Sequence, residues 1–81
     1  MTISNHPRLV ASVKKSTGRE EYRISLRDFN GTTKAEIRVF ERHRDHDWEP
    51  TPRHVVVGAD YLLELIRGLL DAAALLKSEA A

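Results

Sequence analysis

The stretch Tyr22–Phe40, which reads YRISLRDFNGTTKAEIRVF, decides the fold. Two segments of alternating apolar and polar residues flank Asn30-Gly31, and this type of dipeptide is the strongest short signal for a two-residue hairpin turn. If Phe29 and Thr32 flank that turn, the pairing register of the whole hairpin follows. The sequence therefore predicts two long antiparallel strands joined by a tight turn.

This register separates an apolar face of the hairpin from a basic and aromatic face. The apolar pairs are Leu26 with Ala35, Ile24 with Ile37 and Tyr22 with Val39. The other face carries Arg27 opposite Lys34, Ser25 opposite Glu36 and Arg23 opposite Arg38, with Phe29 near the turn and Phe40 at the far end. Like charges directly opposite each other destabilise a sheet by up to about 1 kcal/mol per pair. Two such pairs beside aromatic side chains predict a polyanionic ligand.

The chain is short, has a net charge of only +1 and carries its charges unevenly. Residues 1–44 contain ten Lys/Arg and five Asp/Glu, whereas residues 45–81 contain three and seven. This distribution predicts a basic sheet and an acidic, apolar helix on two chemically different sides. A domain of 81 residues buries only about 60 to 65% of its unfolded surface, so we expect self-association to stabilise it.

The composition also bears on the location of the protein in the cell. There is no cysteine, which leaves neither a disulfide framework nor a thiolate zinc site. No apolar run approaches the roughly 18 residues of a membrane span, and Met1–Arg8 lacks the apolar core of a signal peptide. We therefore expect no membrane association and a cytoplasmic protein, nucleoid-associated if it is bacterial, or a nuclear one.

The whole chain, residues 1–81, is predicted to form a single domain. Residues 1–7 are predicted to be a disordered N-terminus, residues 8–57 an antiparallel sheet and residues 58–77 a C-terminal helix. Within the sheet, the first strand is expected at Arg8–Lys15 with Leu9, Ala11 and Val13 on one side. An exposed loop is expected at Glu41–Pro52, and a short, buried fourth strand at Arg53–Val57.

The predicted helix has more apolar surface than one sheet can cover. One stripe comprises Leu62, Leu65, Ile66, Leu69, Ala73 and Leu76, and a second comprises Leu63, Leu70 and Ala74. A surface helix usually has an apolar arc only a little wider than about 100°. We therefore predict an α+β fold in which a four-stranded antiparallel curved sheet precedes one C-terminal helix that covers one face, and two copies dimerise through the helices. The expected interface residues are Leu63, Ile66, Leu70 and Ala74.

An ordered set of motifs within Tyr22–Tyr61 resembles the transcriptional positive cofactor 4 family. The motifs are Arg27-Asp28-Phe29-Asn30-Gly31, Glu36-Ile37-Arg38-Val39-Phe40-Glu41, and Pro50 followed by Arg53 and the valine strand. The resemblance implies a dimer that binds single-stranded DNA across its curved sheets, with Phe29 stacking on a base and Arg27, Arg38 and Arg53 binding the backbone. Asn30 and Thr32 replace lysines that are usual in this family, and Glu41 replaces an aromatic residue.

We therefore predict a protein that binds single-stranded DNA or RNA and resembles a transcriptional coactivator, with the transcription machinery as a further partner and no cofactor. Cations would bind phosphates, and aromatic rings would stack on bases at about 1–3 kcal/mol per base. The predicted site comprises Arg23, Arg27, Phe29, Lys34, Arg38, Phe40 and Arg53. In the alternative interpretation, Phe29 and Phe40 pack under a loop and the arginines pair with Glu36 and Glu21.

Other candidate residues have simpler explanations. We predict no enzyme, because the chain has no glycine-rich phosphate loop and no spacing typical of a nucleophile, base and orienting group. We predict no metal site at His43, Asp45, His46 and Asp47, because a loop gives them no regular scaffold. Trp48 is expected either to cover the open edge of the core or to stack on a base. Lys14, Lys15 and Arg19 are expected at a turn, as solvated residues or as phosphate contacts.

Two other functions remain as alternatives. A protein-interaction domain with the same fold and a weakened nucleic-acid site is suggested by Asn30, Thr32 and Glu41. A small metal-binding protein would use the histidine-containing loop.

Overall fold

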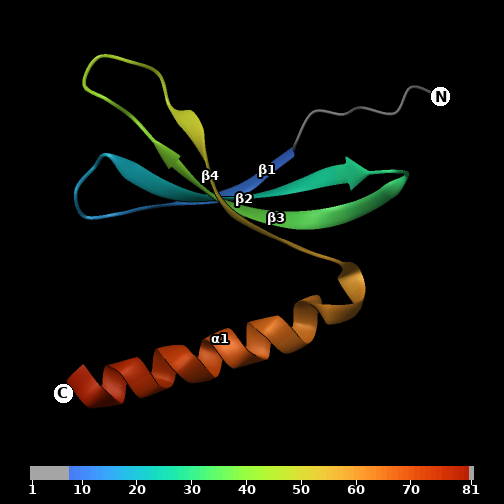
Figure 1. Ribbon diagram of the computed structural model, residues 1–81. Coiled ribbons are helices and arrows are strands. Elements are labelled where there is room, and N and C mark those ends of the chain that lie inside the picture. Colours follow the sequence, from blue (N-terminus) through green and yellow to red (C-terminus); the bar gives the residue numbers. More distant parts are fainter. Residues whose placement is uncertain (1–7, 81) are drawn as a thin grey trace.

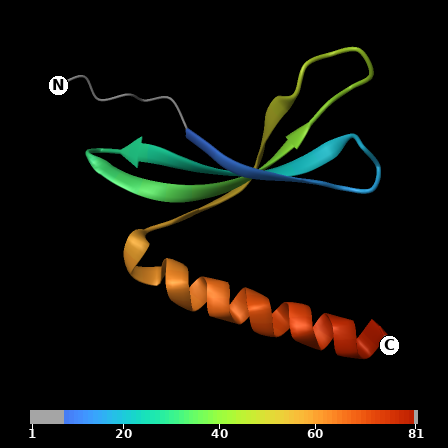
Figure 2. The same ribbon diagram turned by 180° about the vertical axis from the view of Figure 1, so that it is seen from behind.

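The structure is a computed structural model that describes residues 8–80. Its elements are β1 (Arg8–Lys14), β2 (Glu20–Phe29), β3 (Thr32–Glu41), β4 (Glu49–Val57) and α1 (Ala59–Ala80). The strands form one antiparallel sheet in the order β1-β2-β3-β4. Figure 1 shows this sheet strongly twisted above α1, and Figure 2 shows the same arrangement from behind. The predicted four-stranded antiparallel sheet followed by one C-terminal helix is confirmed, and dimerisation through the helices stays a prediction. The expectation of a disordered N-terminus concerns residues outside the described range.

The central hairpin has the predicted register. β2 and β3 pair Leu26 with Ala35, Ile24 with Ile37, Tyr22 with Val39, Arg27 with Lys34, Arg23 with Arg38 and Phe29 with Thr32. Asn30 and Gly31 have φ angles of 50° and 84°. A type I′ turn requires positive φ at both central residues, and its twist matches that of the flanking strands. The turn therefore sets which side chains share each face.

The first strand departs from the predicted alternation because it contains a β-bulge. Its register shifts between Leu9 and Ala11, so that Leu9 lies opposite Ser25 while Ala11 lies opposite Ile24. Val10 is the additional residue, and such a residue reverses the side-chain direction of the strand beyond it. The prediction that Leu9 shares a face with Ala11 and Val13 is therefore wrong.

The fourth strand is longer and more exposed than predicted. It begins at Glu49 rather than Arg53, so the loop before it is shorter than Glu41–Pro52. β4 is an edge strand and Val55 is 49% exposed, so the prediction of a buried strand is wrong. Pro50 and Pro52 fit here because an edge strand has backbone positions that need no partner strand.

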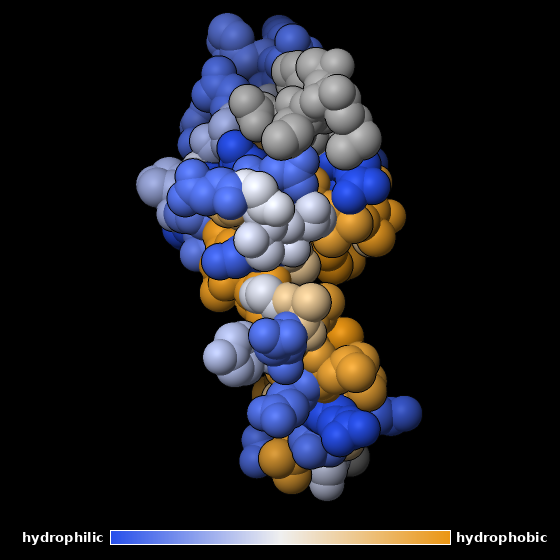
Figure 3. Space-filling view, turned by 90° about the vertical axis from the view of Figure 1, so that its right-hand side faces the viewer, coloured by the Kyte–Doolittle hydropathy of each residue, from blue (hydrophilic) through white to orange (hydrophobic). Residues whose placement is uncertain are grey.

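The helix lies on the apolar side of the sheet without closing over it. α1 extends to Ala80, three residues beyond the predicted end at Lys77, and contains no buried residue. Figure 3 shows hydrophobic side chains on the helix and on the adjoining part of the sheet. Leu65 and Ile66 are 38% and 41% exposed. The expected covering of this face by the chain's own helix is therefore incomplete.

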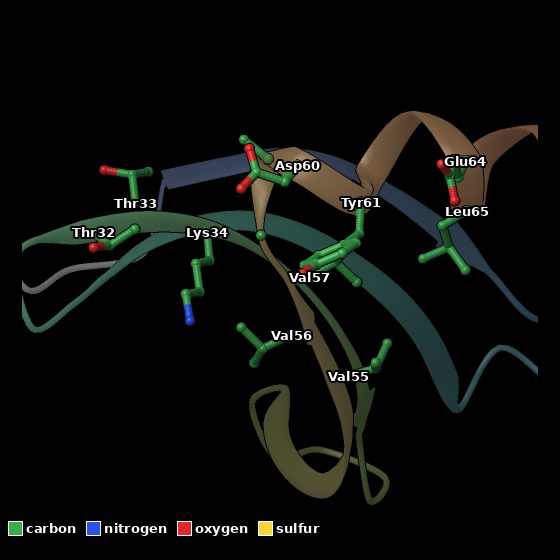
Figure 4. Close-up of a pocket in the computed structure, with 12 residues that line it drawn as sticks. Thr32, Thr33, Lys34, Val55, Val56, Val57, Asp60, Tyr61, Glu64 and Leu65 are labelled. Carbon is green, nitrogen blue, oxygen red and sulfur yellow. The ribbon is translucent and has the colours of Figure 1, made fainter.

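The gap between sheet and helix is an open groove. Figure 4 shows it where β4 leads into α1, with Val55, Val57, Tyr61 and Leu65 among its lining residues. In the part of the chain that the structure describes, Ala35 and Val39 are the buried hydrophobic residues. The folded chain by itself therefore has a very small core. No helix within residues 8–80 has the length and apolar character needed to cross a membrane.

Candidate nucleic-acid interface

One face of the sheet, which we call the outer face, brings together six of the seven predicted nucleic-acid-binding residues. They alternate along β2 and β3 on the side that does not carry Tyr22, Ile24 and Leu26. They are Arg23, Arg27, Phe29, Lys34, Arg38 and Phe40. Lys14, which lies opposite Glu21 in β1, belongs to the same face. The hairpin register therefore positions these side chains together.

A buried carboxylate holds two of these arginines in place. Glu36 is only 4% exposed, and its Oε2 accepts hydrogen bonds from Nη1 of Arg27 at 3.4 Å and Nη2 of Arg38 at 3.0 Å. Nη1 of Arg38 also donates to the backbone carbonyl of Thr51 at 2.6 Å. Arg38 is thus fixed from two sides, which reduces the side-chain entropy that it would lose on binding a ligand.

A second buried carboxylate positions Arg23 beside two aromatic rings. Glu21 is 4% exposed and accepts a hydrogen bond from Nε of Arg23 at 2.6 Å. The guanidinium carbon of Arg23 lies 4.1 Å from the ring centre of Phe40 and 5.8 Å from that of Trp48. Cations within about 6 Å of an aromatic ring centre are attracted to its face. Trp48, which the sequence left between two roles, therefore lies next to the outer face.

The other end of the outer face carries a second combination of cation and ring. The guanidinium carbon of Arg27 lies 5.6 Å from the ring centre of Phe29, near the hairpin turn. Arg23 and Phe29 are six residues apart on β2, which corresponds to about 20 Å along a strand. Aromatic rings are therefore available near both ends of the outer face.

The arginines of the outer face pair with Glu21 and Glu36, as the alternative interpretation of the sequence expected. Like-charged neighbours in the hairpin are compensated by Glu21 and Glu36, so their repulsion alone does not require a polyanion. The outer face nevertheless holds five cations, if Lys14 is included, against these two carboxylates. Phe29 and Phe40 both remain partly exposed. The face is therefore still cationic and aromatic.

The fold and the motifs have a counterpart among solved structures. The crystal structure of a PC4 homologue from Burkholderia pseudomallei, in a tetragonal form, matches with a TM-score of 0.76 and 31% sequence identity. The match covers 84% of this chain and 98% of that chain. This chain belongs to the PC4 (positive cofactor 4) family. An orthorhombic form of the same homologue gives a TM-score of 0.75 and 29% identity, covering 89% of this chain and 96% of that chain. No protein-family model matches the sequence, and no curated protein sequence matches it.

In this PC4-family chain, Arg53 is the one predicted site residue that does not reach the outer face. His54 lies opposite Arg38, so the preceding residue points to the other side of the sheet. There Arg53 pairs with Glu20, whose hydrogen bond raises the pKa of Arg53 and in turn lowers the pKa of Glu20. Its predicted contact with phosphate stays a prediction.

The other predicted sites of this PC4-family protein fall elsewhere in the structure. The residues expected at the dimer interface are all exposed on α1: Leu63, Ile66, Leu70 and Ala74.

Within residues 8–80, no three histidine, aspartate or glutamate side chains come together in a way that could hold a metal ion. Two residues that the predicted site omitted, Arg42 and Trp48, lie 5.0 Å apart from guanidinium carbon to ring centre. Their sequence signal was a tryptophan in a loop of charged residues and histidines.

The lowered pKa of Glu36 makes the stability of this domain depend on pH. Burial tends to raise its pKa, but the hydrogen bond and charge of Arg38, together with Arg27, outweigh this effect and hold the pKa below 4.5. A lowered folded-state pKa stabilises the fold above the unfolded-state pKa, and this stabilisation is lost as the pH falls through the folded-state value. We expect urea denaturation to show falling stability below about pH 4.5, with a smaller fall in Glu36→Gln. Glu79→Gln is the matched control, and an acid profile of Glu36→Gln identical to that of the wild type would contradict this role.

Proposed function

We propose that this protein is a homodimeric, transcriptional coactivator-like protein that binds single-stranded DNA across the outer face of its sheet. The observation that carries the proposal is the joint presence, on one face, of fixed arginines and partly exposed aromatic rings. Membership of the PC4 family supports DNA binding. The protein would act where transcription or another process exposes melted DNA.

The chemistry of the outer face favours binding without sequence preference. Arg23, Arg27, Lys34 and Arg38 would contact phosphates, which are the same in every nucleotide. Phe29 and Phe40 offer ring faces, and every base has a π-face that can stack on them. Because an unpaired strand exposes those base faces and a duplex does not, we expect a preference for single strands.

Dimerisation through α1 would complete the fold. The exposed residues of the second helical stripe include Leu63 and Leu70, at 70% and 65% exposure. A two-fold axis would bring the same patch of both chains together. The dimer would also present two outer faces to one strand, which raises the effective affinity without new contacts.

Fluorescence anisotropy with labelled oligonucleotides tests the proposed function. We expect tighter binding to a single strand than to a duplex of the same length, and a steep loss of affinity with added salt. Equal binding to the two forms, or affinity independent of salt, would contradict the proposal. Dissociation constants no tighter than about 10⁻⁴ to 10⁻⁶ M at physiological salt would instead favour a protein-interaction domain with a weakened site.

The variant Phe29→Ala tests base stacking near the hairpin turn. We expect a loss of about 1–3 kcal/mol in binding free energy, with an unchanged salt dependence, because a ring is removed and no charge. Phe29→Tyr is the matched control, since it keeps an aromatic face, and it should bind nearly as well as the wild type. Equal affinities of Phe29→Ala and Phe29→Tyr would show that this ring takes no part in binding.

A further inference from the structure

A concentration of unpaired positive charge lies at one end of the sheet. The β1–β2 turn (residues 15–19) and the β3–β4 loop (residues 42–48) meet there, and the N–H of Arg42 donates to the carbonyl of Arg19 at 2.9 Å. Figure 1 shows both segments at the same end of the sheet. It also shows the β3–β4 loop on the side away from α1, as does the reverse view in Figure 2.

A hollow between these segments is lined only by arginines and histidines. The lining residues, which we call the loop-end cluster, are Arg19, Arg42, His43, Arg44 and His46. All five are exposed. Within residues 8–80, none of the three arginines of the cluster forms an ion pair, whereas the arginines of the outer face pair with buried glutamates. The cluster therefore offers full positive charges to an anion.

The loop-end cluster is continuous with the outer face. The ring centre of Trp48 lies 5.0 Å from the guanidinium carbon of Arg42 and 5.8 Å from that of Arg23. Arg23 in turn lies 4.1 Å from the ring centre of Phe40. An alternating row of cations and rings thus leads from the outer face into the cluster. A strand that follows this row would bring its phosphates to the hollow.

Several carboxylates lie near the cluster, and one of them faces a histidine. The nearby carboxylates are Asp45 and Asp47 of the loop, Glu41 of β3 and, opposite Glu41, Glu49 of β4. Glu41 lies 3.5 Å from Nε2 of His43. Across the cluster on β2, Glu20 is already paired with Lys15 and Arg53. Protonation of both histidines would add two positive charges to those of the three arginines. Histidine ordinarily titrates near pH 6.5, close to physiological pH.

We propose that the loop-end cluster is a second phosphate-binding site, which holds the backbone of a single strand where it leaves the outer face and binds more strongly when His43 and His46 are protonated. This inference rests on the proposed function, because its ligand is the same strand. The cluster would add contacts beyond those of Arg23, Arg27, Lys34 and Arg38. It would also make the affinity for nucleic acid rise as the pH falls.

The salt dependence of binding tests the site. The probe is a labelled thymidine oligonucleotide of about 20 nucleotides, longer than the roughly 4–16 nucleotides that one single-strand-binding domain usually covers. Each phosphate contact with a single strand contributes about 0.7 to the slope of log affinity against log salt. We expect Arg19→Gln/Arg44→Gln to reduce the slope by about 1.4. The control Arg8→Gln/Arg67→Gln removes the same charge elsewhere and should leave the slope unchanged.

A pH series tests the histidines. Between about pH 8 and pH 5.5 the wild type should gain up to about 1.4 in the salt slope, and His43→Gln/His46→Gln should abolish most of this gain. His54 lies opposite Arg38 on the outer face and is the other candidate source of such a gain. We expect His54→Gln, like His6→Gln, to preserve the gain.

The outcomes separate this inference from the proposed function. If the wild type binds the oligonucleotide but Arg19→Gln/Arg44→Gln has the slope of the wild type or of its control, the loop-end cluster is not a phosphate site. If the gain at low pH survives His43→Gln/His46→Gln, or disappears in His54→Gln, the assignment of the histidines is wrong. If the wild type binds no oligonucleotide at low salt, the proposed function fails, and this inference fails with it.

Discussion

The double variant Leu63→Asp/Leu70→Asp is expected to be monomeric and to lose most of its folded structure. Both leucines are exposed on α1, and Ala35 and Val39 are the buried hydrophobic residues of the described part of the chain. In the proposed dimer, each leucine would contribute about 1.5–3 kcal/mol by burial. The loss of two per chain is large compared with the roughly 5–15 kcal/mol that stabilise a typical domain. Sedimentation and thermal denaturation followed by circular dichroism would measure both effects.

Two controls separate dimerisation from helix stability in this experiment. Leu63→Met/Leu70→Met keeps the apolar surface and should remain a stable dimer, since such exchanges usually cost less than about 1.5 kcal/mol. Ser78→Asp adds a negative charge to α1 outside the two apolar stripes and should also remain dimeric. A folded dimer of Leu63→Asp/Leu70→Asp would show that this stripe is not the interface.

Loss of Arg27 and Arg38 is expected to weaken single-strand binding by about 100-fold or more. The estimate follows from the roughly 1.5–3 kcal/mol that a hydrogen bond to a charged group contributes. The salt slope should also fall by about 1.4, because two phosphate contacts would be lost. Anisotropy titrations of a labelled oligonucleotide over a salt series would give both values.

Glu36 is the buried partner of both arginines, so removing them also affects this carboxylate. Alanine at both positions would leave a buried carboxylate without a partner, and breaking a buried ion pair in this way costs about 3–5 kcal/mol. The informative protein is therefore Arg27→Ala/Arg38→Ala/Glu36→Gln, compared with Glu36→Gln alone. Glu36→Gln keeps both cations and is the reference to which the triple variant is compared. Equal affinity of the triple and single variants would remove these arginines from the binding site.

Much of the fold could be predicted because the decisive signals are local. Asn30-Gly31 sets the type of turn, and the strict two-residue period of β2 and β3 then assigns every side chain of the hairpin to a face. Prediction was weaker at the sheet edges, where a bulge at Val10 and a shift between Arg38 and Phe40 alter the register. A bulge depends on how two distant strands pair, so the alternation of one strand does not reveal it.

By itself, the sequence determined the hairpin, its two chemically different faces and the apolar excess of the helix, because turn chemistry and side-chain periodicity act over a few neighbouring residues. Only the tertiary structure decided that Arg53 pairs with Glu20 on the opposite face and that Glu21 and Glu36 are buried beneath the arginines. It also brought Arg19 next to Arg42 at the loop end. These contacts join segments that are distant in sequence, so they depend on strand order, bulges and the twist of the sheet rather than on local pattern.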